Sequence, residues 1–300
     1  MPSVSSLEDA SALLGAAHAE NRRVRIGEDL TATGLNRILE HDPGDLTCTV
    51  ETGVRLSDLR ETLAASGQRL SLDPPGNPTI GGMLARNLSG PLRHRFGAPR
   101  DLVLGATLVL ADGTIASSGG KVVKNVAGYD LARLVCGSEG RLAFIARASF
   151  RLHPVPKATR TLVVEGDDMA GVAARLLDSQ LQPSALDVLH PGRIAVLFEG
   201  SERAVAAQLA TALALVGGTE SEPSVWQESR ERQAAAGGRI RFAPGDLGAV
   251  LETVDDAVVR VNAGVTYTAV KDPGNSPSQG GQEQLMDRLR RELDPRGVLT

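Results

Sequence analysis

A glycine- and proline-rich stretch, SLDPPGNPTIGGMLARNLSG (residues 71–90), limits most strongly how this chain can fold. Gly81 and Gly82 form a pair before a short apolar run, and Gly90 follows it, so one long helix is not expected here. Glycine has no Cβ and is used where a backbone must come close to another group. The spacing therefore predicts a helix start whose N–H groups could bind a pyrophosphate or a ribityl chain. An ordinary structural turn is the alternative.

The sequence around this stretch predicts mixed helix and sheet. RRVRI (residues 22–26) and TCTVE (residues 47–51) have the composition of strands, and LSDLRETLAAS (residues 56–66) has the apolar spacing of one helical face. Asp112-Gly113 predicts a tight hairpin turn, because both positions tolerate positive φ. LAFIARASFRLHP (residues 142–154) predicts a final strand that is buried at its start. These elements indicate an α+β fold.

His153-Pro154-Val155-Pro156-Lys157 predicts a linker. We expect domains at residues 1–156, with lobes at about 1–70 and 71–156, and at residues 157–300. The predicted elements after the linker are a strand (161–165), a helix (168–179), two strands (185–190 and 194–199) and a helix (201–216). This order is typical of a smaller ferredoxin-like domain.

Charge and cysteine content exclude several classes of function. Lysine and arginine total 32 against 36 aspartate and glutamate, and the net charge of −4 provides no basic footprint for nucleic acid. Cys48 and Cys136 lack metal-ligand spacing, so we expect neither a disulfide framework nor a metal site. No segment has the length and apolarity of a membrane span, and the N-terminus does not resemble a leader. We expect a cytoplasmic protein with no direct membrane insertion, although a partner could associate it with a membrane.

Two familiar nucleotide motifs are absent from the sequence. No GxGxxG follows a predicted strand, so a Rossmann site for NAD lacks its fingerprint. Gly120-Lys121 resembles the end of a P-loop, but Val122 occupies the Ser/Thr position and Ile115 stands where the first glycine belongs. NAD and ATP are therefore disfavoured as ligands.

Two longer motifs occur in sequence order, TIGGMLARNLSGPLRHRFGAPRDLVLGATLVLADGT (79–114) and GGKVVKNVAGYDLARLVCGSEGRLAFI (119–145). Together they resemble the FAD-binding domain of the vanillyl-alcohol oxidase and p-cresol methylhydroxylase (PCMH) type. Within this family the chain is most similar to the E subunits of bacterial glycolate oxidases. The resemblance implies a two-lobed FAD-binding domain, a following cap domain, and an FAD-dependent oxidoreductase.

The resemblance also implies which residues contact FAD. They are Pro75, Thr79, Gly81, Gly82, Asn87, Ser89, Gly90, Asn125, Gly128, Tyr129, Glu139, Gly140 and Ile145. Tyr129 could equally be an ordinary packed tyrosine, and Asp130 is expected to cap the helix that follows it. None of the five histidines lies in the loop that attaches flavin covalently in related enzymes, so noncovalent FAD is expected.

The chain departs from the family pattern at two places. The pyrophosphate loop is reduced to Arg25-Ile26-Gly27-Glu28-Asp29, in which two carboxylates would repel a pyrophosphate unless they point away. The cap segment HxGDGNxH, which supplies metal and substrate contacts in related 2-hydroxy acid dehydrogenases, is missing. The catalytic residues are therefore unknown. His94 lies between two arginines, where a solvated basic turn is favoured over an active-site base.

The resemblance favours a flavoprotein subunit of a glycolate oxidase-like complex that oxidises a 2-hydroxy acid. This subunit would relay electrons or support the complex, beside a sister flavoprotein subunit and an iron-sulfur subunit. One alternative is a free-standing flavin dehydrogenase in which Arg86, Arg93 and Arg95 are candidates to bind the substrate carboxylate. Another is a non-catalytic scaffold that has lost FAD.

Overall fold

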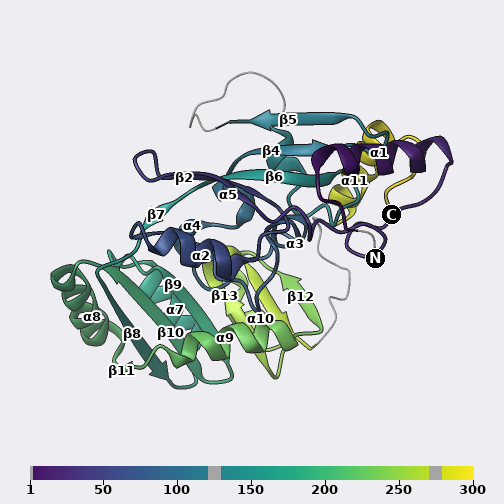
Figure 1. Ribbon diagram of the computed structural model, residues 1–300. Helices are drawn as coiled ribbons and strands as arrows, with labels where there is room; N and C mark the ends of the chain where they lie inside the picture. The colour runs from purple at the N-terminus through teal and green to yellow at the C-terminus, as the bar shows by residue number, and fades with distance from the viewer. Residues whose placement is uncertain (1–2, 121–129, 270–278) are drawn as a thin grey trace.

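The computed structural model describes residues 3–120, 130–269 and 279–300. Figure 1 shows two β-sheets in separate layers, with several short helices between them and both chain termini at one end of the upper sheet. The mixture of helices and sheets confirms the predicted α+β class.

The first sheet contains five antiparallel strands in the order β1-β2-β6-β4-β5. The strands are β1 (Ile38–Asp42), β2 (Thr47–Glu51), β4 (Val103–Val109), β5 (Ile115–Gly119) and β6 (Phe144–Arg151). The predicted hairpin is confirmed between β4 and β5, where Gly113 has a φ of 87°. Because β2 from the first expected lobe pairs directly with β6 from the second, the two lobes expected in this region share one sheet.

Helices cover both faces of the first sheet. Helix α1 (Leu7–Ala19) packs on one core, and α2 (Leu56–Ala64) packs on the other with Leu56, Leu59 and Leu63 buried, as the apolar spacing predicted. The remaining short elements of this part are α3 (Ile80–Ala85), α4 (Arg93–Phe96), α5 (Pro99–Leu102), α6 (Leu131–Leu134), and the strand pair β3 (Gln68–Arg69) and β7 (His153–Pro154). Asp130 caps α6 as expected, since its side chain accepts the N–H of Arg133.

The strand predicted at residues 22–26 is wrong. Only isolated bridges form there, from Val24 to Leu299 and from Ile26 to Leu30. A strand needs a neighbouring strand along its length, whereas this segment meets only the last residues of the chain and its own following turn.

The second sheet contains seven strands in the order β11-β8-β10-β9-β13-β14-β12. Its strands are β8 (Ala158–Glu165), β9 (Ala185–His190), β10 (Arg193–Gly200), β11 (Thr219–Ser221), β12 (Gly238–Arg241), β13 (Ala257–Arg260) and β14 (Val265–Thr268). The first four strands and the helices α7 (Met169–Leu177) and α8 (Glu202–Val216) follow one another in the chain order β8-α7-β9-β10-α8-β11. Their order confirms the predicted ferredoxin-like arrangement.

Each face of the second sheet has its own core. Helices α7, α8 and α10 (Leu247–Leu251) pack on one face, and α9 (Ser224–Ala235) packs on the other. Trp226 of α9 is 5 % exposed, and its Nε1 donates to Oγ1 of Thr161 at 3.0 Å. Two 3₁₀ turns, η1 (Pro244–Asp246) and η2 (Val261–Ala263), complete this part.

The C-terminal segment returns to the first sheet. Helix α11 (Gln279–Leu293) places Met286 and Leu289 against the core under α2, and Leu299 joins the core under α1. These contacts differ from the expectation that residues 157–300 form one domain. We therefore propose two structural units: the first unit comprises residues 3–156 with 279–300, and the second unit comprises residues 158–269.

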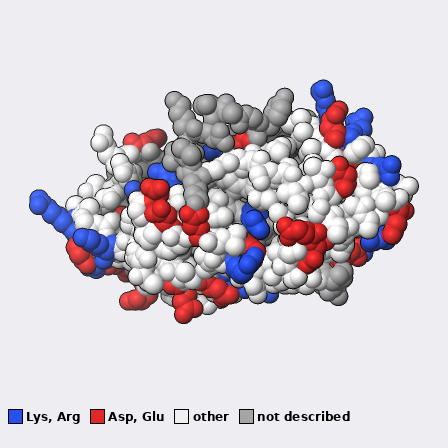
Figure 2. Space-filling model, turned by 45° about the horizontal axis from the view of Figure 1, so that its top comes forward, with Lys and Arg blue, Asp and Glu red and all other residues white. Residues whose placement is uncertain are grey.

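The face of the molecule displayed in Figure 2 carries charges of both signs. Figure 2 shows acidic and basic side chains interspersed over the displayed face. Within the described residues, no helix has both the length and the apolar character needed to cross a membrane.

An ion pair joins the two units. Both terminal nitrogens of Arg69 in β3 donate to the carboxylate oxygens of Glu199 in β10, each at 2.7 Å. The side chains of Arg69 and Glu199 are only 20 % and 6 % exposed. A bidentate pair with this burial fixes both the distance and the orientation of the two units where they meet.

Replacing Arg69 by methionine should therefore destabilise the protein strongly. The Arg69→Met variant leaves the Glu199 carboxylate buried and unpaired, and we expect the free energy of unfolding to fall by about 3 kcal/mol. The control is Arg160→Met, because Arg160 pairs with Glu220 where both side chains are 44 % exposed, and its loss should cost less than about 1 kcal/mol. Urea denaturation followed by circular dichroism measures both changes, and equal losses would contradict the structural role of Arg69.

Candidate functional site

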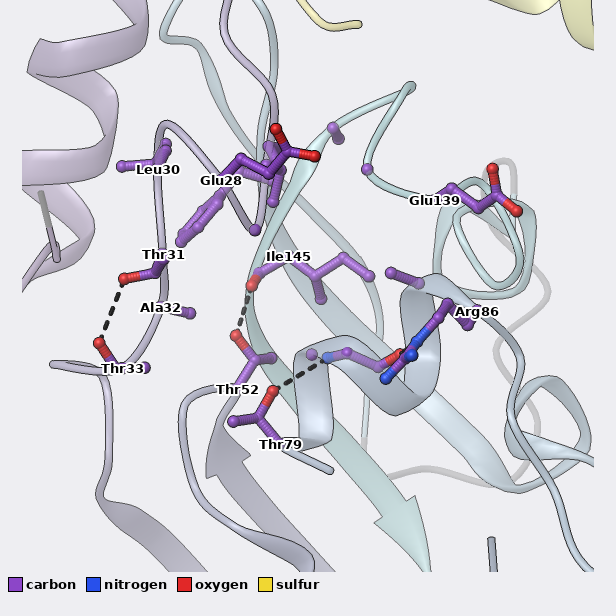
Figure 3. Close-up of a pocket in the computed structure, with 18 residues that line it drawn as sticks. Glu28, Leu30, Thr31, Ala32, Thr33, Thr52, Thr79, Arg86, Glu139 and Ile145 are labelled. Atoms are coloured by element: carbon purple, nitrogen blue, oxygen red, sulfur yellow. Dashed lines mark hydrogen bonds between the residues drawn. The ribbon is translucent and has the colours of Figure 1, made fainter. Parts of the chain in front are cut away.

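A cavity of about 560 Å³ lies in the first unit, beside the start of α3. We call it the first pocket. Its wall comes from parts of the chain that are far apart in sequence, namely the loop at residues 26–33, Thr52, the start of α3 and residues 139–145 (Figure 3). This volume lies within the range of about 300–1,000 Å³ that is usual for small-molecule sites.

The glycine pair at the start of α3 lies in this wall, but its N–H groups are already bonded within the protein. The N–H of Gly81 donates to the carbonyl of Thr52 at 2.7 Å, and the N–H of Gly82 donates to Oγ1 of Thr79 at 3.1 Å. A Cβ on Gly81 would lie 3.1 Å from the Cβ of Thr52, so glycine allows the helix start to pack closely on this threonine. Both N–H groups therefore already have acceptors within the protein, and close packing on Thr52 accounts for the glycine at position 81.

Hydroxyl groups and one guanidinium remain as polar donors in the first pocket. The hydroxyls belong to Thr31, Thr33, Thr52 and Thr79, and the hydroxyl of Thr52 already donates to the carbonyl of Ile145. Arg86 is the one cationic side chain among the described lining residues, and its Nε donates to the carbonyl of Gly82 at 3.2 Å. Figure 3 shows the Arg86 side chain extending along the α3 end of the pocket. An anion with several oxygens can be bound by such a set of donors.

The two carboxylates that line the first pocket have arginine partners of their own. Glu28 pairs with Arg25 at 2.8 Å, and Glu139 pairs with Arg141. In Figure 3 both carboxylates lie at the rim, away from Thr79. Asp29 also turns back to Arg25, whose backbone N–H lowers the pKa of the Asp29 carboxyl. The repulsion expected from the shortened loop is therefore offset locally by arginine.

A larger cavity of about 1,400 Å³ lies between the two units, and we call it the second pocket. Arg86 and Glu139 line both pockets, so the two cavities adjoin each other. The arginines that line the second pocket are Arg86, Arg93, Arg100, Arg133, Arg239 and Arg241. Glu139 is the one carboxylate in the described lining. The second pocket is therefore strongly cationic, although the net charge of the chain is negative.

Known proteins identify the family. A family model described as an FAD binding domain matches residues 24–119. Glycolate oxidase subunit GlcE of Escherichia coli (strain K12) is 31 % identical over 317 residues, which cover 93 % of this chain and 89 % of that protein. The chain belongs to the FAD-binding oxidoreductases of the PCMH type.

Other relatives match over only part of their own length. Glycolate oxidase subunit GlcD of Bacillus subtilis (strain 168) is 36 % identical over 54 % of this chain and 36 % of that protein. D-lactate dehydrogenase [cytochrome] 1, mitochondrial, of Saccharomyces cerevisiae is 34 % identical over 55 % of this chain and 29 % of that protein. A solved structure of alkyldihydroxyacetonephosphate synthase covers 99 % of this chain and 75 % of its own with a TM-score of 0.74 at 16 % identity, which shows a shared fold.

The donors in the two pockets fit FAD, the cofactor of this family. The first pocket combines hydroxyls with Arg86, as a diphosphate requires. The adjoining second pocket provides room for a flavin ring and a second ligand. Apolar lining from Leu88, Leu134 and Met286 accompanies the arginines there.

The structure brings most of the predicted FAD contacts to these pockets. Thr79, Gly81, Gly82, Glu139, Gly140 and Ile145 line the first pocket, while Pro75, Asn87 and again Glu139 line the second. Asn125, Gly128 and Tyr129 lie outside the described residues.

Ser89 and Gly90 line neither of these pockets. Ser89 is 1 % exposed, and its carbonyl accepts Nε2 of Gln233 from the second unit at 2.9 Å. A Cβ on Gly90 would lie 1.8 Å from the carbonyl oxygen of Asp73. Close backbone packing and contact between the units therefore explain the presence of Ser89 and Gly90. Neither residue has exposed surface there for a cofactor.

The structure corrects the expectation of a solvated turn at His94. Helix α4 is packed against the second unit, and the carbonyl of His94 accepts Nδ2 of Asn262 at 3.1 Å. Burial lowers the pKa of His94 to about 4, so the imidazole is neutral at pH 7.

Arg86 and Arg93 line the second pocket as candidate carboxylate ligands. Arg95 is exposed and lies outside this pocket, where its guanidinium faces the Phe96 ring at 5.7 Å.

The residues that the second unit contributes to the second pocket were not predicted from the sequence. Arg239 and Arg241 lie on β12, and Tyr267 lies on the neighbouring strand β14. The alternation in Arg239-Ile240-Arg241 is a strand pattern that places both arginines on one face. The pattern does not show that β12 lies opposite α4, because that placement depends on contacts between residues more than a hundred positions apart.

The carboxyl of Asp73, which lines neither pocket, has a raised pKa. Burial raises the pKa of Asp73 to about 7, against opposing effects of Arg260, the backbone N–H of Leu92 and Arg230. Its side chain is 15 % exposed and lies 3.8 Å from Arg230. The folded protein therefore binds the Asp73 proton more tightly than the unfolded chain does.

This shift predicts a loss of stability as the pH rises. The stabilising contribution of protonated Asp73 is complete below the unfolded pKa of 3.8 and is lost as the pH rises towards 7. At 1.36 kcal/mol per pKa unit, the difference amounts to about 4 kcal/mol. Asp73→Asn, which cannot ionise, should remove this fall in urea denaturation measured from pH 4 to pH 8. Asp255→Asn at an exposed position is the control, and the same pH profile for all three proteins would contradict the assignment.

Gly82→Asp should weaken FAD binding. A Cβ at this position would lie 3.6 Å from Nη2 of Arg86, so the new carboxylate would pair with the cation of the first pocket and repel a diphosphate. We expect the dissociation constant for FAD to rise at least about tenfold, or about 1.4 kcal/mol. Isothermal titration calorimetry with FAD measures it. Gly245→Asp, in open space outside the pockets, is the control, and unchanged FAD affinity in folded Gly82→Asp would remove the first pocket from the cofactor site.

Proposed function

We propose that this chain is the FAD-binding subunit of a glycolate oxidase-like complex that oxidises a 2-hydroxy acid. The similarity to GlcE over nearly the whole chain supports a subunit role. The observation that carries the proposal is the cationic second pocket, which adjoins the first pocket and is open to both units. A 2-hydroxy acid is an anion that such a pocket attracts, and the adjoining flavin would accept its electrons.

In this proposal the residues of the chain bind and orient. The hydroxyls of the first pocket and Arg86 hold the diphosphate of FAD, and arginines of the second pocket orient the carboxylate of the substrate. FAD supplies the hydride acceptor when it is bound. The second unit packs over the pocket and limits access of water from that side.

A group that removes the hydroxyl proton is also required. In the described lining of the two pockets there is no histidine, and both carboxylates, Glu28 and Glu139, are paired with arginine. His190 lies at the end of β9, and its carbonyl accepts Arg232. We therefore propose that a sister flavoprotein subunit completes the oxidation and that an iron-sulfur subunit receives the electrons. The described residues contain no cluster of histidine, cysteine, aspartate and glutamate that could hold a metal.

The isolated chain should bind one noncovalent FAD but oxidise glycolate and D-lactate slowly with a dye acceptor. Heat or acid should release the flavin, which is measured by its absorbance. Activity should appear when the chain is mixed with its sister flavoprotein and iron-sulfur subunits, and it should be lost when Gly82→Asp replaces the native chain.

Each other outcome selects a different function. Rapid turnover by the isolated chain would overturn the subunit proposal in favour of a free-standing flavin dehydrogenase. Failure to bind FAD together with full activity of the complex would instead indicate a scaffold. His190→Ala is the further test of a free-standing flavin dehydrogenase. Loss of turnover in that variant would identify a base outside the described pockets.

A further inference from the structure

We propose that Arg93, Arg239 and Tyr267 form a binding subsite for a small carboxylate in the second pocket, and that buried Arg260 positions Tyr267 within it. The inference deepens the proposed function by assigning the residues that recognise the anionic end of the substrate. Carboxylate binding can be measured without turnover, so the two proposals can fail separately.

Strand register places two of these side chains together. Arg239 on β12 is the direct cross-strand partner of Tyr267 on β14, and cross-strand partners lie on the same face of a sheet. Both residues line the second pocket. Arg93 lines the same pocket from α4, so the three side chains approach one space from both structural units.

The cations of this subsite lack a matching carboxylate. No ion pair joins Arg93 or Arg239 to an acidic side chain within the described residues. Burial lowers the pKa of Arg93, and although Tyr267 and Asp101 oppose this effect, Arg260 and Arg239 add to it. Like charges that are partly withdrawn from water are costly without an anion. A bound carboxylate would remove this cost, and its two oxygens match the fork of a guanidinium.

The buried guanidinium of Arg260 packs against the ring of Tyr267. It is 1 % exposed, and its Cζ lies 4.9 Å from the centre of the Tyr267 ring. Its Nη2 donates to Oε1 of Gln233 at 2.8 Å, and its Nε lies 3.5 Å from Oδ1 of Asp187. A guanidinium with these contacts cannot reach the pocket itself. It fixes the ring, and the ring in turn places the phenolic hydroxyl beside the arginines.

The contact from Gln233 extends this support to the first unit. Nε2 of Gln233 donates to the carbonyl of Ser89, which precedes α4 and Arg93. Gln233 therefore ties Arg260 to the backbone that carries Arg93. One buried network sets the positions of Tyr267 and Arg93 relative to each other.

Oxalate is the probe for the test. The FAD-loaded protein is titrated with oxalate by calorimetry and by the change in flavin absorbance, and inorganic phosphate is titrated in parallel. Arg93→Gln and Arg239→Gln should each raise the dissociation constant for oxalate at least about tenfold, and Tyr267→Phe should raise it about three- to tenfold. Arg95→Gln, in the same helix as Arg93 but outside the pocket, should leave it unchanged. FAD affinity should be the same in all variants.

Three results would overturn the subsite. They are equal oxalate affinity in all variants, tighter binding of phosphate than of oxalate, and a loss of FAD affinity in Arg93→Gln or Arg239→Gln, which would assign these cations to the cofactor. If the chain binds no FAD, the calorimetric titration is made on the cofactor-free protein. Oxalate binding that depends on Arg93 and Arg239 would then sustain the subsite while the proposed function fails.

A double-mutant cycle tests the positioning role of Arg260. Arg260→Lys keeps a cation beside Asp187 but removes the planar contact with Tyr267. It should weaken oxalate binding about threefold or more in the native background and have no effect in a Tyr267→Phe background, because Arg260 acts through the phenolic hydroxyl. Equal effects in the two backgrounds would show a general structural role and overturn this part of the proposal. Should Arg260→Lys fail to fold, Gln233→Leu gives the same comparison.

Discussion

Arg260 is a fully buried cation at the place where the two units meet, and the shape of the larger pocket depends on it. Its charge is offset by Asp187, and its hydrogen bond to Gln233 continues to the carbonyl of Ser89. A buried arginine is stable only while such partners stay in place, so the network fixes the distance between the units. The pocket that we assign to the substrate lies directly beside this network.

Much of the architecture could be predicted from local patterns. The helix at residues 56–66 followed from apolar spacing, and the hairpin at Gly113 followed from turn chemistry. The ferredoxin-like order followed from the alternation of strands and helices. The segment at residues 22–26 failed because strand composition does not reveal whether a partner strand exists, and its neighbour is the last part of the chain.

Several residues predicted to contact FAD line the first pocket, but their hydrogen bonds could not be predicted. The family motifs located Thr79, Gly82 and Ile145 at the first pocket. The motif could not show that the N–H groups of the glycine pair are already bonded, because the acceptor at Thr52 comes from another segment. Arg239 and Tyr267 were missed for a similar reason. Their role comes from the way one unit faces the other, which no short stretch of sequence records.

The return of the C-terminal segment changes how the second unit is attached. Because α11 and Leu299 pack on the first unit, the second unit is an insertion with two tethers instead of an appendage with one. Deleting the last residues of the chain would uncover the core beneath α1, because Leu299 belongs to that core. The attachment of the second unit to the first therefore depends on residues at the far end of the polypeptide.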